Sequence, residues 1–154
     1  MSYVDCPPAY YLPQIHGASQ TAQQVDRMSA NAFLNVRLGP PGRDQGLTDL
    51  HAVANEAGML RTFEGMRTVE RAVKFLANIP SSAAVPIISL DPDGEVAFDW
   101  EHGGDMFSVS LGASGRLTYA GEIDEVMTKG STFFGATLPE AVIAAIGAFP
   151  LHRA

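Results

Sequence analysis

Asp99 and Glu101 lie two residues apart in the stretch EVAFDWE, residues 95–101, where polar and apolar side chains alternate. Such alternation is typical of a β-strand with one face in water, so both carboxylates should point to the same side. A carboxylate pair can serve as general acid and general base. A solvated acidic face gives the same pattern, and we favour that interpretation because catalytic carboxylates need burial that polar alternation does not indicate. The predicted acidic face comprises Glu95, Asp99, Glu101 and Glu122.

A second stretch with the residue types for chemistry is Gly103-Gly104-Asp105. It resembles the GGDEF signature of diguanylate cyclases, in which a β-hairpin binds a nucleotide. Here the fourth position is Met106 instead of an acidic residue, and no acidic metal motif precedes it. We therefore interpret the two glycines as a turn between strands, because a tight hairpin needs residues that tolerate positive φ.

The stretch DPDGE, residues 91–95, resembles the start of a calcium-binding loop. A calcium loop of the EF-hand type needs glycine at its sixth position, whereas Gly94 stands at the fourth. Proline at the second position and glycine at the fourth are typical of a type I turn. The sequence therefore predicts a turn here and no metal site.

Cys6 is the single cysteine of the chain, which excludes an intrachain disulfide and a cysteine-based zinc cluster. A nucleophilic dyad of Cys6 with a histidine would need a base nearby, and no sequence signature supplies one. The histidines form no i, i+4 pair that could hold a metal. We predict no catalytic residue, no metal and no cofactor. The four histidines are His16, His51, His102 and His152.

The elements that would position these side chains follow from the apolar periodicity. Apolar residues recur at helical spacing over 47–57, where Gly58 provides a stop, and over 68–79, where Thr68 could cap the start. After Pro80 the period changes from 3.6 to 2. Short glycine-containing loops then separate strands, which makes consecutive strands antiparallel neighbours. STFFGA, residues 131–136, is the predicted fifth strand, and a Thr137/Glu140 capping box predicts a final helix.

The predicted fold class is α+β: an antiparallel β-meander of four or five strands over about 85–136, packed against amphipathic helices, with a C-terminal helix. Phe98, Trp100, Phe107, Val109, Leu111 and Tyr119 should form its core. Residues 1–46 are predicted to be an irregular N-terminal arm with one helix, and 47–154 a single domain.

Charge is unevenly distributed along the chain. The net charge is −7, and residues 81–154 carry ten of the 17 acidic residues against Arg116, Lys129 and Arg153. An acidic surface repels phosphate backbones and attracts basic partners, so we expect a basic protein partner and no nucleic acid. We also expect no membrane association and a cytoplasmic location, because the N-terminus lacks a basic and apolar signal sequence and no apolar run could span a bilayer.

The C-terminal helix predicts self-association. AVIAAIGA, residues 141–148, has no polar side chain, although a helix on a sheet needs only one apolar stripe. Val142, Ile143 and Ile146 can pack on the sheet. The opposite face would then need a cover, either the N-terminal arm or, as we favour, a second copy in a homodimer. The predicted oligomer interface is Ala141, Ala144, Ala145 and Ala148.

Residues 70–121 also resemble a group of small bacterial proteins without an assigned activity. Their pattern is a helix ending in Phe-Leu-x-x-(Leu/Ile)-Pro, a strand led by proline, Pro-Asp-Gly-Glu, a strand ending in an acidic residue and tryptophan, and a hairpin. The resemblance implies the fold, a bacterial origin and a cytoplasmic location, and it adds no catalytic residue. The positions that carry it are Phe75, Leu76, Pro80, Pro86, Pro92, Asp93, Gly94, Glu95, Asp99 and Trp100.

Three classes of function remain open. A non-catalytic protein-interaction or regulatory module is the leading interpretation, because the acidic asymmetry is present and recognisable catalytic constellations are not. The second is a small-molecule-binding domain with a pocket between sheet and helices, lined by Tyr119, Trp100 or Phe134. The third is an enzyme that uses Asp99 and Glu101, or Cys6.

Overall fold

The five strands lie in the sheet in the same order as in the sequence, and each pairs antiparallel with the next. The structure is a computed structural model that describes residues 41–151. The α+β fold with an antiparallel meander and a C-terminal helix is therefore confirmed. The elements are α2 (Pro41–Glu56), the 3-10 turn η1 (Met59–Arg61), α3 (Phe63–Asn78), β1 (Ile87–Leu90), β2 (Val96–His102), β3 (Asp105–Leu111), β4 (Arg116–Ile123), β5 (Val126–Phe133) and α4 (Glu140–Ile146).

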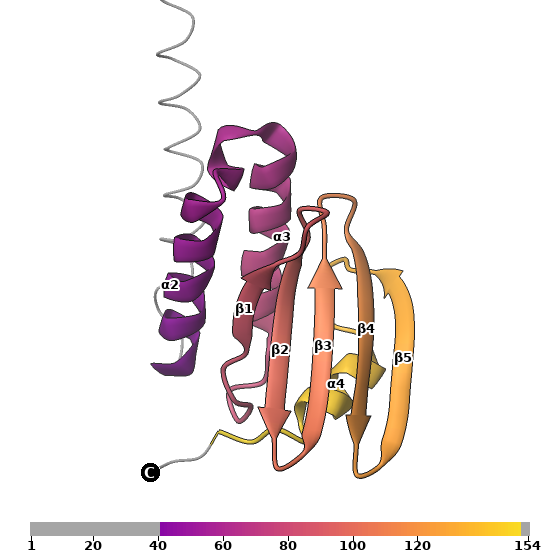
Figure 1. Ribbon diagram of the computed structural model, residues 1–154. Coiled ribbons are helices and arrows are strands. Elements are labelled where there is room, and N and C mark those ends of the chain that lie inside the picture. The colour runs from indigo at the N-terminus through magenta and orange to yellow at the C-terminus, as the bar shows by residue number, and fades with distance from the viewer. Residues whose placement is uncertain (1–40, 152–154) are drawn as a thin grey trace, which may run out of the picture.

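The helices lie on one face of the sheet (Figure 1). Helices α2 and α3 lie beside and behind β1 and β2, and α4 lies behind β3 and β4. Within residues 41–151 no helix covers the other face, which we call the uncovered face. No helix of this range is long and apolar enough to cross a membrane.

Alternation along the strands sends large apolar side chains toward the helices. Phe98, Phe107, Val109 and Leu111 are fully buried, and Trp100 is 3% exposed. The ring of Phe98 stacks on Phe75 of α3, with centroids 4.4 Å apart. The predicted core is therefore confirmed, except that Tyr119 is only half-buried at its margin.

The first two helices of the described residues, α2 and α3, begin earlier than the sequence predicts. Helix α2 begins at Pro41 and so runs across the predicted domain start at 47, because proline suits a first helical position. The expected cap at Thr68 is wrong: α3 begins after Thr62, whose hydroxyl accepts a hydrogen bond from the N–H of Gly65 at 3.0 Å. Thr68 is instead buried inside the helix and donates to the carbonyl of Glu64.

The fifth strand is also displaced from its predicted position. It runs over Val126–Phe133 rather than 131–136, because a two-residue turn at Asp124 and Glu125 follows β4 directly. Both turn residues have positive φ, 51° and 63°, a region that usually carries glycine or asparagine. The turn therefore lacks the glycine that marks the other hairpins in the sequence.

The predicted Thr137/Glu140 capping box does not form. The N-cap of α4 is Pro139, which makes no side-chain capping hydrogen bond. The carbonyl of Pro139 accepts hydrogen bonds from the N–H groups of Val142 and Ile143, each at 3.0 Å. Thr137 is exposed.

We predict that Phe98→Ala lowers the free energy of unfolding by about 3–5 kcal/mol, because the deletion leaves a cavity against Phe75. Urea denaturation measures this loss. Ile87→Ala, at a side chain 65% exposed on the neighbouring strand, is the control and should change stability by less than about 0.5 kcal/mol. Equal effects of the two substitutions would contradict the assignment of the core face.

Candidate functional site

Side chains from all five strands form cross-strand rows on the uncovered face. The strand register aligns Ser110 of β3 with Ala97 and Thr118, which gives a row of small side chains. The next row contains Asp99, Ser108 and Lys129. Most side chains of these two rows are small or polar.

A third row lies at the end of the sheet where β2 meets β3. Glu101 pairs with Met106, Met106 with Glu122, and Glu122 with Met127. All four side chains are exposed, Met106 by 56% and Met127 by 68%. We call Glu101, Met106, Glu122 and Met127 the acidic–methionine row. Acidic and thioether side chains therefore alternate across four strands.

Two turns bring further carboxylates to the same end of the sheet. Gly103 and Gly104 join β2 to β3 with φ angles of 63° and 101°, as expected of a glycine turn. The carboxylate of Asp105 accepts a hydrogen bond from the backbone N–H of Asp124 at 3.0 Å. The Gly-Gly-Asp stretch thus has a structural role, since Asp105 links its own turn to the β4–β5 turn.

The four residues of the predicted acidic face share the uncovered face, but only three of them lie near one another. Glu101 and Glu122 belong to the acidic–methionine row, and Asp99 lies in the adjacent row, hydrogen-bonded to the hydroxyl of Ser108. Glu95 lies at the opposite end of β2, where its carboxylate is 2.8 Å from the Ser110 hydroxyl. The structure therefore brings three of the four together and separates Glu95.

Ser110 also contacts the DPDG turn that the sequence predicts between β1 and β2. The Ser110 hydroxyl lies 2.9 Å from the carboxylate of Asp91. The N–H of Gly94 donates to the carbonyl of Asp91 at 2.9 Å, and Gly94 has a φ of 80°. Among residues 41–151, no group of three histidine, cysteine or acidic side chains could hold a metal ion.

Sequence reasoning missed Met106, Met127 and the two turn acids Asp124 and Glu125. Met106 lies at a position of β3 that the alternation of side chains assigns to the solvent-exposed face, and this alternation was the signal that could have identified it. Met127 and the turn acids could not be placed because the β4–β5 turn carries no glycine. The residues that lie beside Met127 and the turn acids depend on how β4 and β5 pair, and separation along the sequence does not predict this register.

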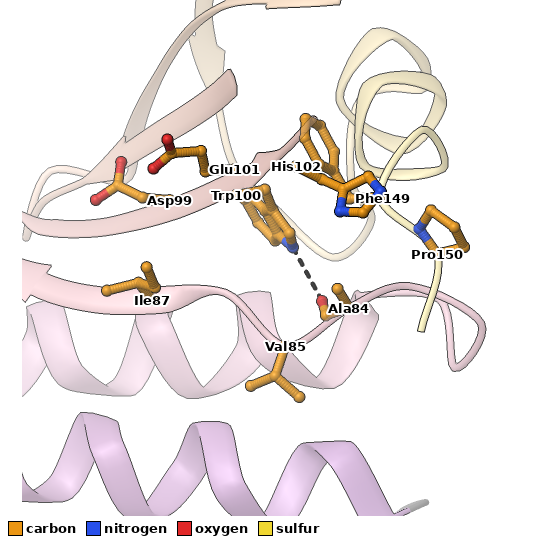
Figure 2. Close-up of a pocket in the computed structure, with 9 residues that line it drawn as sticks. All are labelled: Ala84, Val85, Ile87, Asp99, Trp100, Glu101, His102, Phe149 and Pro150. Carbon is orange, nitrogen blue, oxygen red and sulfur yellow. Dashed lines mark hydrogen bonds between the residues drawn. The ribbon is translucent and has the colours of Figure 1, made fainter. Parts of the chain in front are cut away.

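A small pocket borders β2 on the side of β1 (Figure 2). Its volume is about 180 Å³, and the indole N–H of Trp100 donates to the carbonyl of Ala84 at 2.9 Å beside it. Figure 2 shows the carboxylates of Asp99 and Glu101 on the other side of β2 from this indole. The lining residues are Ala84, Val85, Ile87, Asp99, Trp100, Glu101, His102, Phe149 and Pro150.

Two of the three aromatic residues predicted to line a pocket between sheet and helices pack against other rings instead. Phe134 is buried against Phe75, with ring centroids 5.9 Å apart, so it contributes to packing. Tyr119 packs beside Phe107 with its centroid 6.1 Å away. Neither Tyr119 nor Phe134 lines the pocket of Figure 2.

The structure exposes three of the four residues of the predicted oligomer interface on α4. Ala141, Ala144 and Ala148 are exposed, but Ala145 is buried and therefore does not belong to the outward face. Ile143, expected against the sheet, is 42% exposed. The buried stripe of the helix is therefore rotated from the expected one, and the interface itself stays a prediction. Cys6, His16 and His152 lie outside the described residues.

No family model, curated protein or solved structure matches the chain. The resemblance to the group of small bacterial proteins stays a prediction.

We predict that Asp105→Ala lowers the free energy of unfolding by about 0.5–1.5 kcal/mol, because the N–H of Asp124 loses its acceptor. Chemical denaturation checks this. Asp93→Ala in the exposed β1–β2 turn removes an equal charge without breaking a described hydrogen bond and is the matched control. A loss no larger than that of the control would show that Asp105 does not hold the two turns together.

Proposed function

We propose that the protein is a non-catalytic interaction module that binds a basic segment of a partner protein. The observation that carries this proposal is the acidic–methionine row on the uncovered face, where Glu101 and Glu122 flank Met106. Carboxylates there would attract lysine and arginine side chains, and the methionines would contact apolar side chains between them.

The surrounding charge supports a basic partner. Asp99, Asp105, Asp124 and Glu125 lie around the acidic–methionine row, and Lys129 is the nearest basic residue on the uncovered face of the described strands. Carboxylates on one surface add their fields and speed the encounter with an oppositely charged segment. The same fields would repel a nucleic acid.

Exposed methionines suit a peptide partner. Their unbranched, polarisable side chains adapt to different apolar surfaces, and such residues are frequent at peptide-binding sites. Met106 and Met127 are 56% and 68% exposed, which leaves their thioether groups available for contact. A purely electrostatic surface would not need them.

The spacing of the row fits a helix that lies across the strands. Adjacent strands are about 4.8 Å apart, close to the rise of about 5.4 Å per helical turn. A helix with basic and apolar side chains at alternate turns would therefore oppose carboxylate, methionine, carboxylate and methionine in sequence. We infer a basic amphipathic helix as the partner segment.

The other two functions have weaker support. The pocket beside Trp100 has about 180 Å³, below the roughly 300–1,000 Å³ of pockets that enclose a small ligand. Asp99 and Glu101 border this small pocket from the uncovered sheet face, whereas catalytic groups are usually held in a larger concave site that excludes water.

A defined peptide tests the proposal. The probe is a helical peptide with lysine and leucine at alternate turns of one face, and binding is measured by calorimetry. We predict that the double variant Glu101→Gln/Glu122→Gln binds it about tenfold more weakly and with less dependence on salt, since neutralised carboxylates lose their attraction.

Two further variants serve as comparisons for the double variant. Glu56→Gln/Glu64→Gln removes the same charge from the helical layer and should leave the affinity unchanged. Met106→Ala should weaken binding with an unchanged salt dependence. If the row variant and the helical-layer variant bind the peptide equally well, the proposed function is wrong.

A further inference from the structure

Strand β5 forms the free edge of the sheet. It pairs with β4 on one side, and no other strand of residues 41–151 pairs with it. The opposite edge, β1, lies next to α2 (Figure 1). Three apolar side chains of β5 are strongly exposed: Val126 by 65%, Met127 by 68% and Phe133 by 76%. A long unpaired edge with exposed apolar side chains readily pairs with another strand.

The turn before β5 determines which backbone groups face the free edge. Ile123 and Val126 flank a two-residue turn with both φ angles positive, and the residues that flank such a turn form a hydrogen-bonded pair. Even-numbered residues therefore direct their backbone groups toward β4. The next even-numbered residue, Phe134, follows the same pattern, because its N–H donates to the carbonyl of Gly115 at 2.8 Å. The unpaired groups belong to Met127, Lys129, Ser131 and Phe133.

We propose that β5 pairs antiparallel with β5 of a second copy of this chain, with Gly130 of both copies at the two-fold axis. The two five-stranded sheets then form one continuous sheet with both helical layers on the same side. Four residue pairs would then join their unpaired N–H and carbonyl groups, which gives about eight hydrogen bonds.

The side chains favour this register over the two that are centred one residue away. Met127 lies opposite the partner's Phe133 on the uncovered face, so the exposed thioether and ring cover each other in both halves of the interface. Lys129 lies opposite the partner's Ser131. Centring the pair on Lys129 would place two lysines directly opposite, and centring it on Ser131 would leave Met127 opposite the partner's Gly135.

Gly130 is suited to the axis. A Cβ there would clash with the hydroxyl oxygen of Tyr119, so the tyrosine covers this glycine from the helical side. At the axis, Tyr119 and the partner's Tyr119 would approach each other over the two glycines. The pairing would thereby bury more of a ring that is only half-buried in the single chain.

Charge does not oppose the pairing. Antiparallel alignment places the acidic turn of Asp124 and Glu125 beside the partner's Gly135 and Ala136, away from the partner's own acidic turn. Although each chain has a net charge of −7, no acidic side chains stand opposite each other along β5.

Charge substitutions on the full chain test the register. By light scattering at micromolar concentration, the wild type should have twice the chain mass of 16.4 kDa. Met127→Lys/Phe133→Lys opposes like charges across the axis and should give the mass of one chain. Met127→Lys/Phe133→Glu opposes unlike charges and should restore the doubled mass.

Two controls distinguish the β5 edge from the rest of the protein surface. Met106→Lys places the same charge on β3, away from the edge, and should stay dimeric with altered peptide binding only. Circular dichroism confirms that each variant is folded. A monomeric wild type would overturn the proposal. So would a dimer that is lost on Ala144→Glu in α4 but kept in Met127→Lys/Phe133→Lys. The proposal is also wrong if the charge-complementary variant Met127→Lys/Phe133→Glu stays monomeric. The peptide affinity is measured separately, so either proposal can fail alone.

Discussion

The stacked rings of Phe75 and Phe98, with centroids 4.4 Å apart, join helix α3 to strand β2 of the sheet. Because Phe98 must point to the helices, every second residue of β2 does so too, and the register with β3 and β4 extends the same choice across the sheet. Glu101 and Asp99 are thereby committed to the uncovered face. The position of the candidate site depends on this contact more than on any interaction among the acidic residues.

Short connections concentrate charge at one end of the sheet. The β2–β3 and β4–β5 turns lie at the same end because strands joined by tight turns alternate in direction. Glu101, Asp105, Glu122 and Asp124 come together there, although they are spread over more than twenty residues of sequence. The hydrogen bond from the Asp124 N–H to Asp105 shows that one of these carboxylates also stabilises the arrangement.

The proposed peptide site and the proposed dimer edge meet at Met127. In the paired sheet, the acidic–methionine row would continue into the partner's Phe133 and then the partner's Arg116, since Arg116 aligns with Phe133 in the register. A bound segment would then meet apolar and basic side chains beyond Met127. Pairing uses the backbone edge of β5 and the side chain of Met127, whereas Glu101, Met106 and Glu122 lie on β2, β3 and β4, away from this edge.

The sequence by itself determined the α+β class, the strand alternation and the buried ring of Trp100, because these follow from local periodicity and glycine turns. It misplaced β5 and the start of α3, since a turn without glycine and a cap at Thr62 leave weak local signals. Only the tertiary structure decided that Glu122 lies beside Met106 while Glu95 lies far from both. Pairing register and strand direction are set by contacts between distant residues, and these contacts have no signature within a single stretch of sequence.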